Sequence, residues 1–590
     1  MNNTSSRSLA DLPDILHEVF SFLDPDIHLS DDNAVYESRR SLAIAARACR
    51  GFSTPALRVL WRQLPDDQPL ADLLCTLGVA ARRHETETRH DERKPARHRL
   101  PTYKVRGHPD FVGIEAYKIL WKQSRGYDVI YSLICSGDPR AHPHWARFVE
   151  YASRVRAITL FAFDGPKWCG LWDELRSATN CAAVLPMLQS VSFCSISERS
   201  VNLGTFALIS PTVHRLHLPF ESRRSSPQRH EMLCTIFSRA FLAAPNVAEL
   251  RLALPPSRFG LALLQTHCSR VSHIEVDPQL DVQDLGMLAQ LPALRSLSIS
   301  ISLLAYPSCS LTFRSLTTLK VAGSWSDIST LLDTLRLPSM HTLSLMAHEN
   351  GKPAAELAEG AAQCFRTIAS RHGSITSLSV FTTSPVRPWV SGCVPPRIPA
   401  VPDRFEGKLM DIVHPLLSLH ALRHLSVTLP TYFKLTCVAS DHRLMAEAWR
   451  DLESFHLVIR PYTRLMRIKH AERPYGGPLM GIAHYARNCP RLRLLHLSPM
   501  MMGEKALVGV ALPLERHGLR TLVIPRVLLP PGREDLSGLI SERVGGLFPL
   551  AASAFRPERI VMEKHWAVMT GASWCPECAG GPVEPAPPFW

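Results

Sequence analysis

One short apolar pattern recurs along most of this 590-residue chain and constrains what it can fold into. The pattern has the form aliphatic-x-x-aliphatic-x-aliphatic, first at residues 155–160 and again at 188–193. Alternating apolar and polar residues of this kind are typical of a strand that buries one face. Further copies centre on Leu216/Leu218, Leu250/Leu252, Ile274/Val276, Leu297/Ile299, Leu319/Val321, Leu343/Leu345, Leu378/Val380, Leu425/Val427, Phe455/Leu457, Leu495/Leu497, Leu522/Ile524 and Ile560/Met562.

The spacing of these copies indicates a repeat. Ile274, Leu297, Leu319 and Leu343 follow one another at 23, 22 and 24 residues, by subtraction of their numbers. Later steps are longer, so insertions interrupt the series. Helical patterns lie between the strands, as at 326–335, where Ile328, Leu331, Leu332 and Leu335 share one face, and at 354–369. One strand and one helix per repeat predict parallel strands stacked side by side.

This period resembles that of leucine-rich repeats, which is about 20–29 residues. The resemblance implies a solenoid in which the strand leucines point into the core, while residues such as Arg215, His217, Ser296 and Ser298 face a concave surface. The repeats are degenerate, because the position where the consensus has Asn or Cys holds other residues. These residues are Ser302, Ser324, His348, Pro430 and Met500. A general α/β domain with a parallel sheet is the alternative.

Three short amphipathic segments precede the repeats. In 12–23 the apolar residues form a helical stripe, and Pro13 sits in the first turn, where a missing N–H costs nothing. A second helix is expected at 42–49, ended by Gly51, and a third from Thr54 onward. An acidic insert, 24–39, separates the first two helices. Three helices of this size make a small core that gains stability from a neighbouring domain or partner.

The 10–64 span resembles an F-box of the form common in fungal multi-copy F-box proteins, through the sequences LPDILHEVFSFLD and SLAIAARACRGFSTPALRVLWRQL. The insert at 24–39 departs from the compact family pattern. The resemblance implies a surface that binds a Skp-type adaptor. It is carried over onto Leu12, Pro13, Ile15, Leu16, Val19, Phe20, Leu57, Leu60 and Trp61. Some of these side chains must fill the core of the helices instead, and the sequence does not sort them.

Composition excludes several other classes of protein. No apolar run reaches the ~18 residues of a membrane span, and the first residues lack the features of a signal peptide, so we expect a cytoplasmic or nuclear location. Fifteen cysteines are scattered singly, and Cys49, Cys194, Cys268 and Cys489 are interpreted as small buried hydrophobes. The formal charge of +13 is spread along the chain, which does not favour a nucleic-acid binder.

The sequence offers no catalytic constellation. It lacks a phosphate-binding loop, a His-Glu-x-x-His motif and a Gly-x-Ser-x-Gly elbow, and the pair His142/His144 falls on a loop broken by proline. Cys575 and Cys578 form one Cys-x-x-Cys, whereas a structural zinc site needs four ligands. We therefore expect no cofactor, no metal and no catalysis by this chain.

Three polar or proline-rich segments are expected to be loops. They are 82–101 with its mixed charges, 221–230, and the insertion 384–405 with six prolines. Trp389, between prolines in that insertion, is a candidate anchor for a target protein, and a spacer without contacts is the equal alternative.

Together these observations predict an α/β protein: an F-box at 8–65, a linker and helical connection at 66–150 with a disordered segment near 82–101, a leucine-rich-repeat-like solenoid with parallel strands at 151–565, and a tail at 566–590. The resemblance implies a substrate receptor of a Skp–cullin–F-box ubiquitin ligase. Such a receptor docks on the adaptor, and through it on cullin and RING subunits, and binds an unknown target for ubiquitination and proteasomal degradation. A protein-binding scaffold with no role in ubiquitin transfer is the alternative function.

Overall fold

The protein was analysed as a computed structural model. The structure describes residues 13–24, 32–84, 129–134, 137–162, 169–180, 182–196, 203–219, 227–253, 264–265, 269–280, 282–301, 310–348, 352–383, 405–430, 433–460, 481–498, 500–501, 517–524, 527–529, 542, 544–550 and 560–562.

The chain is an α/β protein with a parallel sheet of fourteen strands. It divides into two compact units, Met1–Pro278 with Gln283–Leu294 and Gln279–Val282 with Arg295–Trp590. The first unit contributes β1, β4, β5, β6, β7 and most of β8 to the sheet, and the second unit contributes the strands from β9 to β21.

Three helices open the first unit: α1 (Pro13–Ser21), α2 (Asp32–Ala48) and α3 (Arg50–Arg62). The expected bounds of the second and third helices were wrong. The second helix begins at Asp32, inside the segment interpreted as an acidic insert, because carboxylates favour the first turn of a helix. The helices are separated at Cys49, whose backbone is extended, so Gly51 lies in the first turn of α3 instead of ending α2.

The first unit continues with β1 (Gln63–Leu64), β4 (Ala157–Ala162), β5 (Ser190–Ile196), β6 (Arg215–Pro219), β7 (Glu249–Ala253) and β8 (His273–Leu280), all parallel. An antiparallel pair, β2 (Ala80–His84) with β3 (Val129–Leu133), stands apart from this sheet. The helices are α4 (Gln68–Thr76), α6 (Trp145–Ala152), α7 (Cys169–Ala178), α8 (Pro227–Ala243) and α10 (Val282–Leu288).

The second unit contains β9 (Ser296–Ile301), β11 (Thr318–Gly323), β13 (Thr342–His348), β14 (Ser377–Thr383), β16 (His424–Pro430), β18 (Ser454–Arg460), β19 (Leu494–Leu497) and β21 (Thr521–Val523). Their register is constant. Leu297, Leu319 and Leu343 are direct partners in neighbouring strands, and all three are buried, as the repeat spacing predicts. The series continues through Leu378, Leu425, Phe455, Leu495 and Leu522.

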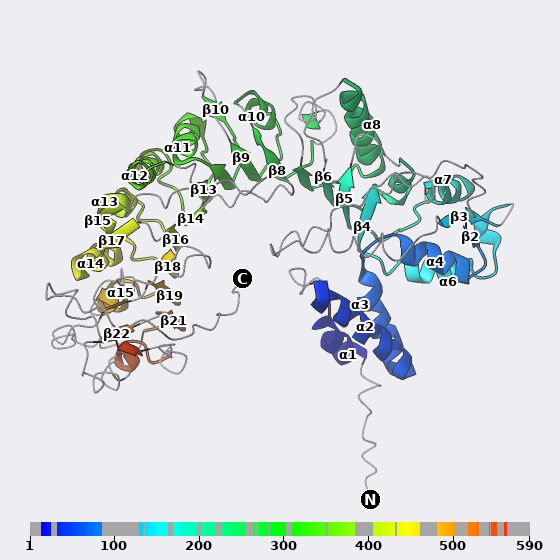
Figure 1. Cartoon of the computed structure of the whole chain (residues 1–590), viewed down its shortest axis with the longest axis horizontal. Helices are drawn as coiled ribbons and strands as arrows, with labels where there is room; N and C mark the ends of the chain where they lie inside the picture. Colours follow the sequence, from blue (N-terminus) through cyan, green and yellow to red (C-terminus); the bar gives the residue numbers. More distant parts are fainter. Residues whose placement is uncertain are drawn as a thin grey trace, which may run out of the picture. The chain divides into compact units, whose positions relative to one another are not determined.

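The helices of the second unit lie on one side of these strands (Figure 1). They are α11 (Trp325–Thr334), α12 (Ala354–Arg371), α13 (Leu409–Val413), α14 (Ala439–Ala448) and α15 (Ile482–Asn488). Ile328, Leu331 and Leu332 of α11 are buried against the strands, as their helical spacing predicts. On the opposite side of β9, β11 and β13, the alternate residues are half-buried or exposed.

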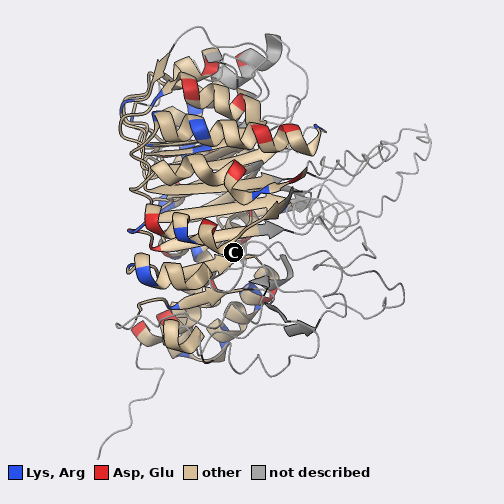
Figure 2. Ribbon diagram, turned by 90° about the vertical axis from the view of Figure 1, so that its left-hand side faces the viewer, with Lys and Arg blue, Asp and Glu red and all other residues tan. Residues whose placement is uncertain are grey.

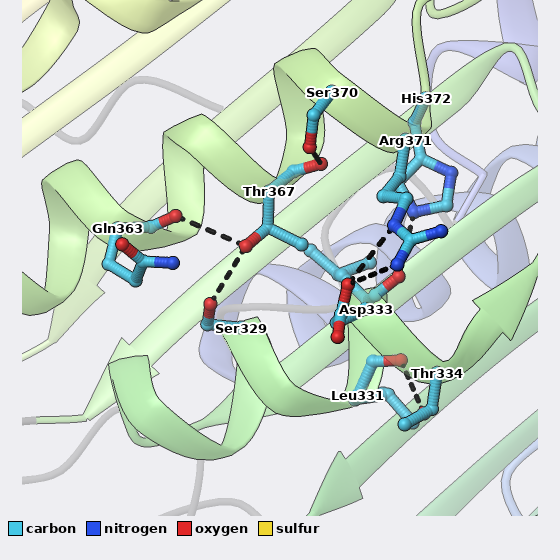
Figure 3. Close-up of polar contacts among 10 residues, drawn as sticks. Ser329, Leu331, Asp333, Thr334, Gln363, Thr367, Ser370, Arg371 and His372 are labelled. Atoms are coloured by element: carbon cyan, nitrogen blue, oxygen red, sulfur yellow. Dashed lines mark hydrogen bonds and ion pairs between the residues drawn. The ribbon is translucent and has the colours of Figure 1, made fainter. Parts of the chain in front are cut away.

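Neighbouring helices are held in register by polar contacts (Figure 3). Thr367 of α12 shares a hydrogen bond of 3.1 Å with Ser329 of α11, and its hydroxyl donates to the carbonyl of Gln363 at 3.2 Å. Arg371 forms a 3.0 Å ion pair with Asp333. The helices also approach closely at Gly360, where a Cβ atom would come within 2.9 Å of the Trp325 side chain.

At one repeat, the residue that replaces the consensus asparagine caps the helix that follows. Ser324 caps α11, because its hydroxyl accepts the N–H of Asp327 at 3.2 Å and donates to the Asp327 carboxylate at 2.7 Å. A serine at this position thus accepts a hydrogen bond from one of the backbone N–H groups that have no partner within the first turn of a helix.

Several other expectations were wrong in their details. Residues 82–84 of the segment expected to be a loop belong to β2, whereas 85–101 lie outside the described residues. Residues 227–230 of the second segment expected to be a loop belong to α8, whereas 221–226 lie outside the described residues. Cys49 is exposed, although Cys489 is buried as expected. Ile560–Met562 forms a strand, β23, which pairs with β22 (Val527–Leu529) in a small separate sheet with β20 (Met500–Met501).

Two further small parallel sheets accompany the second unit. They pair β10 (Leu311–Thr312) with β12 (Leu335–Arg336), and β15 (Phe405–Lys408) with β17 (Phe433–Thr436). Phe405, the last residue of the insertion expected at 384–405, therefore begins a strand.

Candidate interaction surfaces

Helix α1 divides its apolar residues between the core and the surface. Leu16 and Phe20 are 2% and 7% exposed, and they pack in a core with Leu42, Ala56 and Val59. Ile15 and Val19 are each 48% exposed. Phe22, directly after the helix, is 69% exposed. Ile15 and Val19 lie one turn apart on the same face of α1. Together with Phe22 in the turn that follows, they form an exposed apolar group, called here the α1 stripe.

The remaining residues of the implied adaptor surface have mixed positions. Leu57 is half-buried, and Leu60 is half-buried against the helical core. Trp61 contacts Tyr151 of α6, with ring centroids 5.0 Å apart. Leu12 lies outside the described residues, and Pro13 is the first residue of α1. The sequence did not single out Phe22, although its spacing from Ile15 and Val19 would have placed it on the same stripe.

The three helices are joined to the sheet without a linker. Arg62 ends α3 and Gln63 begins β1, which pairs with β4. The backbone N–H of Arg156 donates to the Arg62 carbonyl at 2.8 Å. The Arg62 guanidinium also forms a 3.1 Å ion pair with Asp24, a buried residue after α1. The backbone bond therefore fixes this end of α3 at the start of β4, and the ion pair fixes it to the turn after α1.

A buried carboxyl lies just beyond this junction. Asp67 is fully buried, and the indole N–H of Trp172 in α7 donates to it at 2.6 Å. Burial raises the pKa of Asp67 from 3.8 to about 6, the Trp172 hydrogen bond opposes this rise, and the neighbouring Asp66 adds to it. The protein thus holds an acid that is costly to ionise between α4 and α7.

The open face, defined as the side of the strands opposite the helices, is charged but balanced in the first unit. Arg215 of β6 forms a 3.0 Å ion pair with Glu249 of β7. Arg251 of β7 pairs with Glu275 of β8 at 3.3 Å. Each pair joins direct partners in neighbouring strands. Burial, and secondarily Arg251, lowers the pKa of the neighbouring His217 to about 4, so this histidine is neutral at physiological pH.

The open face of the second unit is composed differently. Its middle row follows the strand register from β9 to β21 and consists of Ser298, Lys320, Ser344, Ser379, Ser426, His456, His496 and Val523. The row two residues further along consists of Ser300, Ala322, Met346, Phe381, Thr428 and Val458. Lys320 is exposed, and Ser298 and Ser344 are half-buried, on the side of their strands opposite the buried leucines.

A cysteine, a histidine and a tyrosine lie together in the second unit, and burial shifts the pKa of each. His442 of α14 lies between the Tyr485 hydroxyl at 3.1 Å and the Cys437 sulfur at 3.3 Å. Burial raises the pKa of Cys437 to about 12 and lowers that of His442 to about 4. A protonated thiol beside a buried neutral imidazole is a packed polar contact, because the thiolate is the nucleophilic form.

The remaining candidate positions are those for a metal ion, for a target anchor and for a membrane span. Within the described part of the chain, no group of three or more His, Cys, Asp or Glu side chains is arranged to hold a metal ion. His142 and His144 are close, with ring centroids 5.7 Å apart. Trp389, Cys575 and Cys578 lie outside the described residues. None of the described helices is both long and apolar enough to cross a membrane.

The chain was compared with protein-family models, curated proteins and solved structures. No known protein family and no curated protein matches the sequence. A solved structure described as "Crystal structure of a TDR receptor" aligns with 13% sequence identity and a TM-score of 0.24. The alignment covers 65% of this chain and 57% of that one. A likeness at this TM-score carries no conclusion about fold or function.

Proposed function

We propose that the chain is the substrate receptor of a Skp–cullin–F-box ubiquitin ligase, with an N-terminal F-box and a leucine-rich-repeat-like solenoid. The observation that carries this proposal is the α1 stripe. Ile15, Val19 and Phe22 are not needed for the core of the helices, since Leu16 and Phe20 fill it. Exposed apolar residues gathered on one helix face are typical of a docking site for another protein.

In this proposal the chain contributes position and no bond chemistry. The α1 stripe docks on the adaptor, where a few apolar anchors dominate the binding free energy. Because α3 runs directly into β1, the docked helices and the first strands move together. The open face then holds a target protein near the conjugating enzyme. Tethering raises the effective concentration of the target lysine at the thioester, which is the source of the rate enhancement.

Co-purification from cells tests the proposal. The variant Ile15→Glu/Val19→Glu places two charges on exposed positions, so the helices stay folded while the apolar contact is lost. We expect wild type to bring down a Skp-type adaptor and a cullin, and the variant to lose most of both. Leu242→Glu, at a still more exposed position on α8, is the matched control and should retain them. Circular dichroism establishes that each variant is folded.

Two outcomes contradict the proposal. If wild type captures neither adaptor nor cullin, the chain is not a receptor of this ligase class and the scaffold function remains. If the folded double variant captures both as well as wild type does, the α1 stripe is not the docking site.

A further inference from the structure

Among the described residues, β9, β11 and β13, the strands around Lys320, carry no acidic side chain. Residues 295–348, which include β9, β11 and β13, contain two acidic residues, Asp327 and Asp333, and the next one, Glu349, lies outside the described residues. Both belong to α11 on the helical side: Asp327 is bonded to Ser324, and Asp333 is paired with Arg371. Lys320 is exposed and has no ion-pair partner among the described residues.

The open face of the first unit differs in this respect from the strand that carries Lys320. On the open face of the first unit, each arginine of β6 and β7 is neutralised by a glutamate in the next strand. On the helices and turns drawn in Figure 2, Lys, Arg, Asp and Glu lie interspersed, whereas the strands are mostly without charge. A cation without a counter-charge in this setting is a point of electrostatic complementarity for an anionic group.

The neighbours of Lys320 supply donors for such a group. Ser298 and Ser344 are its direct partners in the adjacent strands, on the same face. The two serines stand on strands about 4.8 Å to either side of the Lys320 strand, so their hydroxyls and the ammonium can together donate hydrogen bonds to both oxygens of a carboxylate. Charge-assisted bonds of this kind are stronger than bonds between neutral groups.

An exposed apolar side chain, Met346, lies close to Lys320. Met346 of β13 is 44% exposed and occupies the next row, beside Ala322. The strand rise and the strand spacing place the Cα atoms of Lys320 and Met346 about 8 Å apart. Two residues of an extended peptide span ~6.8 Å, so one peptide can place a carboxylate on Lys320 and an apolar side chain on Met346, two or three positions apart.

We infer that this part of the open face binds an extended acidic segment of a target protein, with Asp or Glu at Lys320 and an apolar residue two or three positions away at Met346. The inference rests on the proposed function, because it names the class of target that the receptor takes. The unmodified carboxylate is the anion.

Peptide display tests this inference with the full-length protein. The immobilised wild type selects from a random library of unmodified 12-residue peptides. The selected peptides are then synthesised with a fluorophore, and their dissociation constants are measured by fluorescence anisotropy. We expect enriched peptides to share Asp or Glu with an apolar residue two or three positions away. Lys320→Glu should weaken their binding at least tenfold, and Met346→Ser should weaken it severalfold.

Arg366→Glu is the matched control, since it reverses one exposed charge on α12 and should leave the dissociation constants unchanged. The inference is overturned if no selected peptide depends on Lys320, or if the dependent peptides are not enriched in Asp and Glu. Adaptor capture is measured on the same proteins. Lys320→Glu should retain it, so a failed peptide selection with normal adaptor capture rejects the inference alone. Absent adaptor capture by wild type rejects the proposed function instead.

Discussion

Replacing Asp67 by asparagine should make the first unit more stable at neutral pH than the natural protein. The folded carboxyl releases its proton near pH 6 and the unfolded one near pH 3.8. In this window the unfolded state binds fewer protons, so the free energy of unfolding falls as pH rises. The two pKa values differ by about 2, and at ~1.36 kcal/mol per pH unit the full penalty is about 3 kcal/mol, reached above pH 6. The amide of the variant is neutral at every pH, and its oxygen can still accept the N–H of Trp172.

Hydrogen exchange measures this effect locally, on peptides that cover α4 and α7, after correction for the intrinsic rates. Because the folded and unfolded states of wild type bind protons differently, the protection factors of Asp67→Asn should exceed those of wild type by about 6-fold at pH 4.5 and about 150-fold at pH 7.5. The new amide group adds a cost of its own, but that cost does not vary with pH. The ratio between the two pH values is therefore the decisive quantity.

Trp172→Phe serves as the opposing variant. It removes the hydrogen bond that favours the ionised carboxyl, so the pKa of Asp67 should rise further and the loss of protection between pH 4.5 and 7.5 should grow. An Asp67→Asn protein whose protection exceeds wild type by the same factor at both pH values would refute the reasoning.

Four further substitutions probe the repeat array by chemical denaturation of the second unit. Leu319→Ala should lower the free energy of unfolding by about 2–5 kcal/mol, because it leaves a cavity in the shared core, whereas Ser344→Ala on the open face should change it little; equal effects would contradict the register. Ser324→Ala should cost about 0.5–2 kcal/mol through loss of the α11 cap, and an unchanged midpoint would show that the cap contributes nothing. Gly360→Ala should destabilise, because its Cβ meets Trp325, and a gain in stability would mean that α11 and α12 separate without cost.

The strand positions were predictable from the sequence because one physical pattern recurs. Leu297, Leu319 and Leu343 each sit in an alternating run, and a spacing of 22 to 24 residues returns the chain to the same depth of the core. The two-residue strand β1 has no alternation to detect. It exists because the backbone of Arg62 accepts a hydrogen bond from Arg156, which is distant in sequence.

The candidate surfaces were harder to predict, since exposure depends on what packs nearby. Ile15 and Leu16 are adjacent and equally apolar, and only the position of the other two helices decides that Leu16 is buried. Trp61 meets Tyr151, a residue of a later helix that the sequence does not link to it. The buried state of Asp67 likewise depends on Trp172.

Because the register of the strands is constant, insertions between strands and substitutions within strands have independent effects on the open face. From Leu297 to Leu319 the chain takes 22 residues, and from Leu378 to Leu425 it takes 47, yet both steps move one strand along and preserve the alignment. Residues gained or lost between strands therefore leave the row of side chains undisturbed. Single substitutions within the row alter the face without altering length. A gene for such an array can change the side chains of the open face by point mutation while its connections lengthen independently.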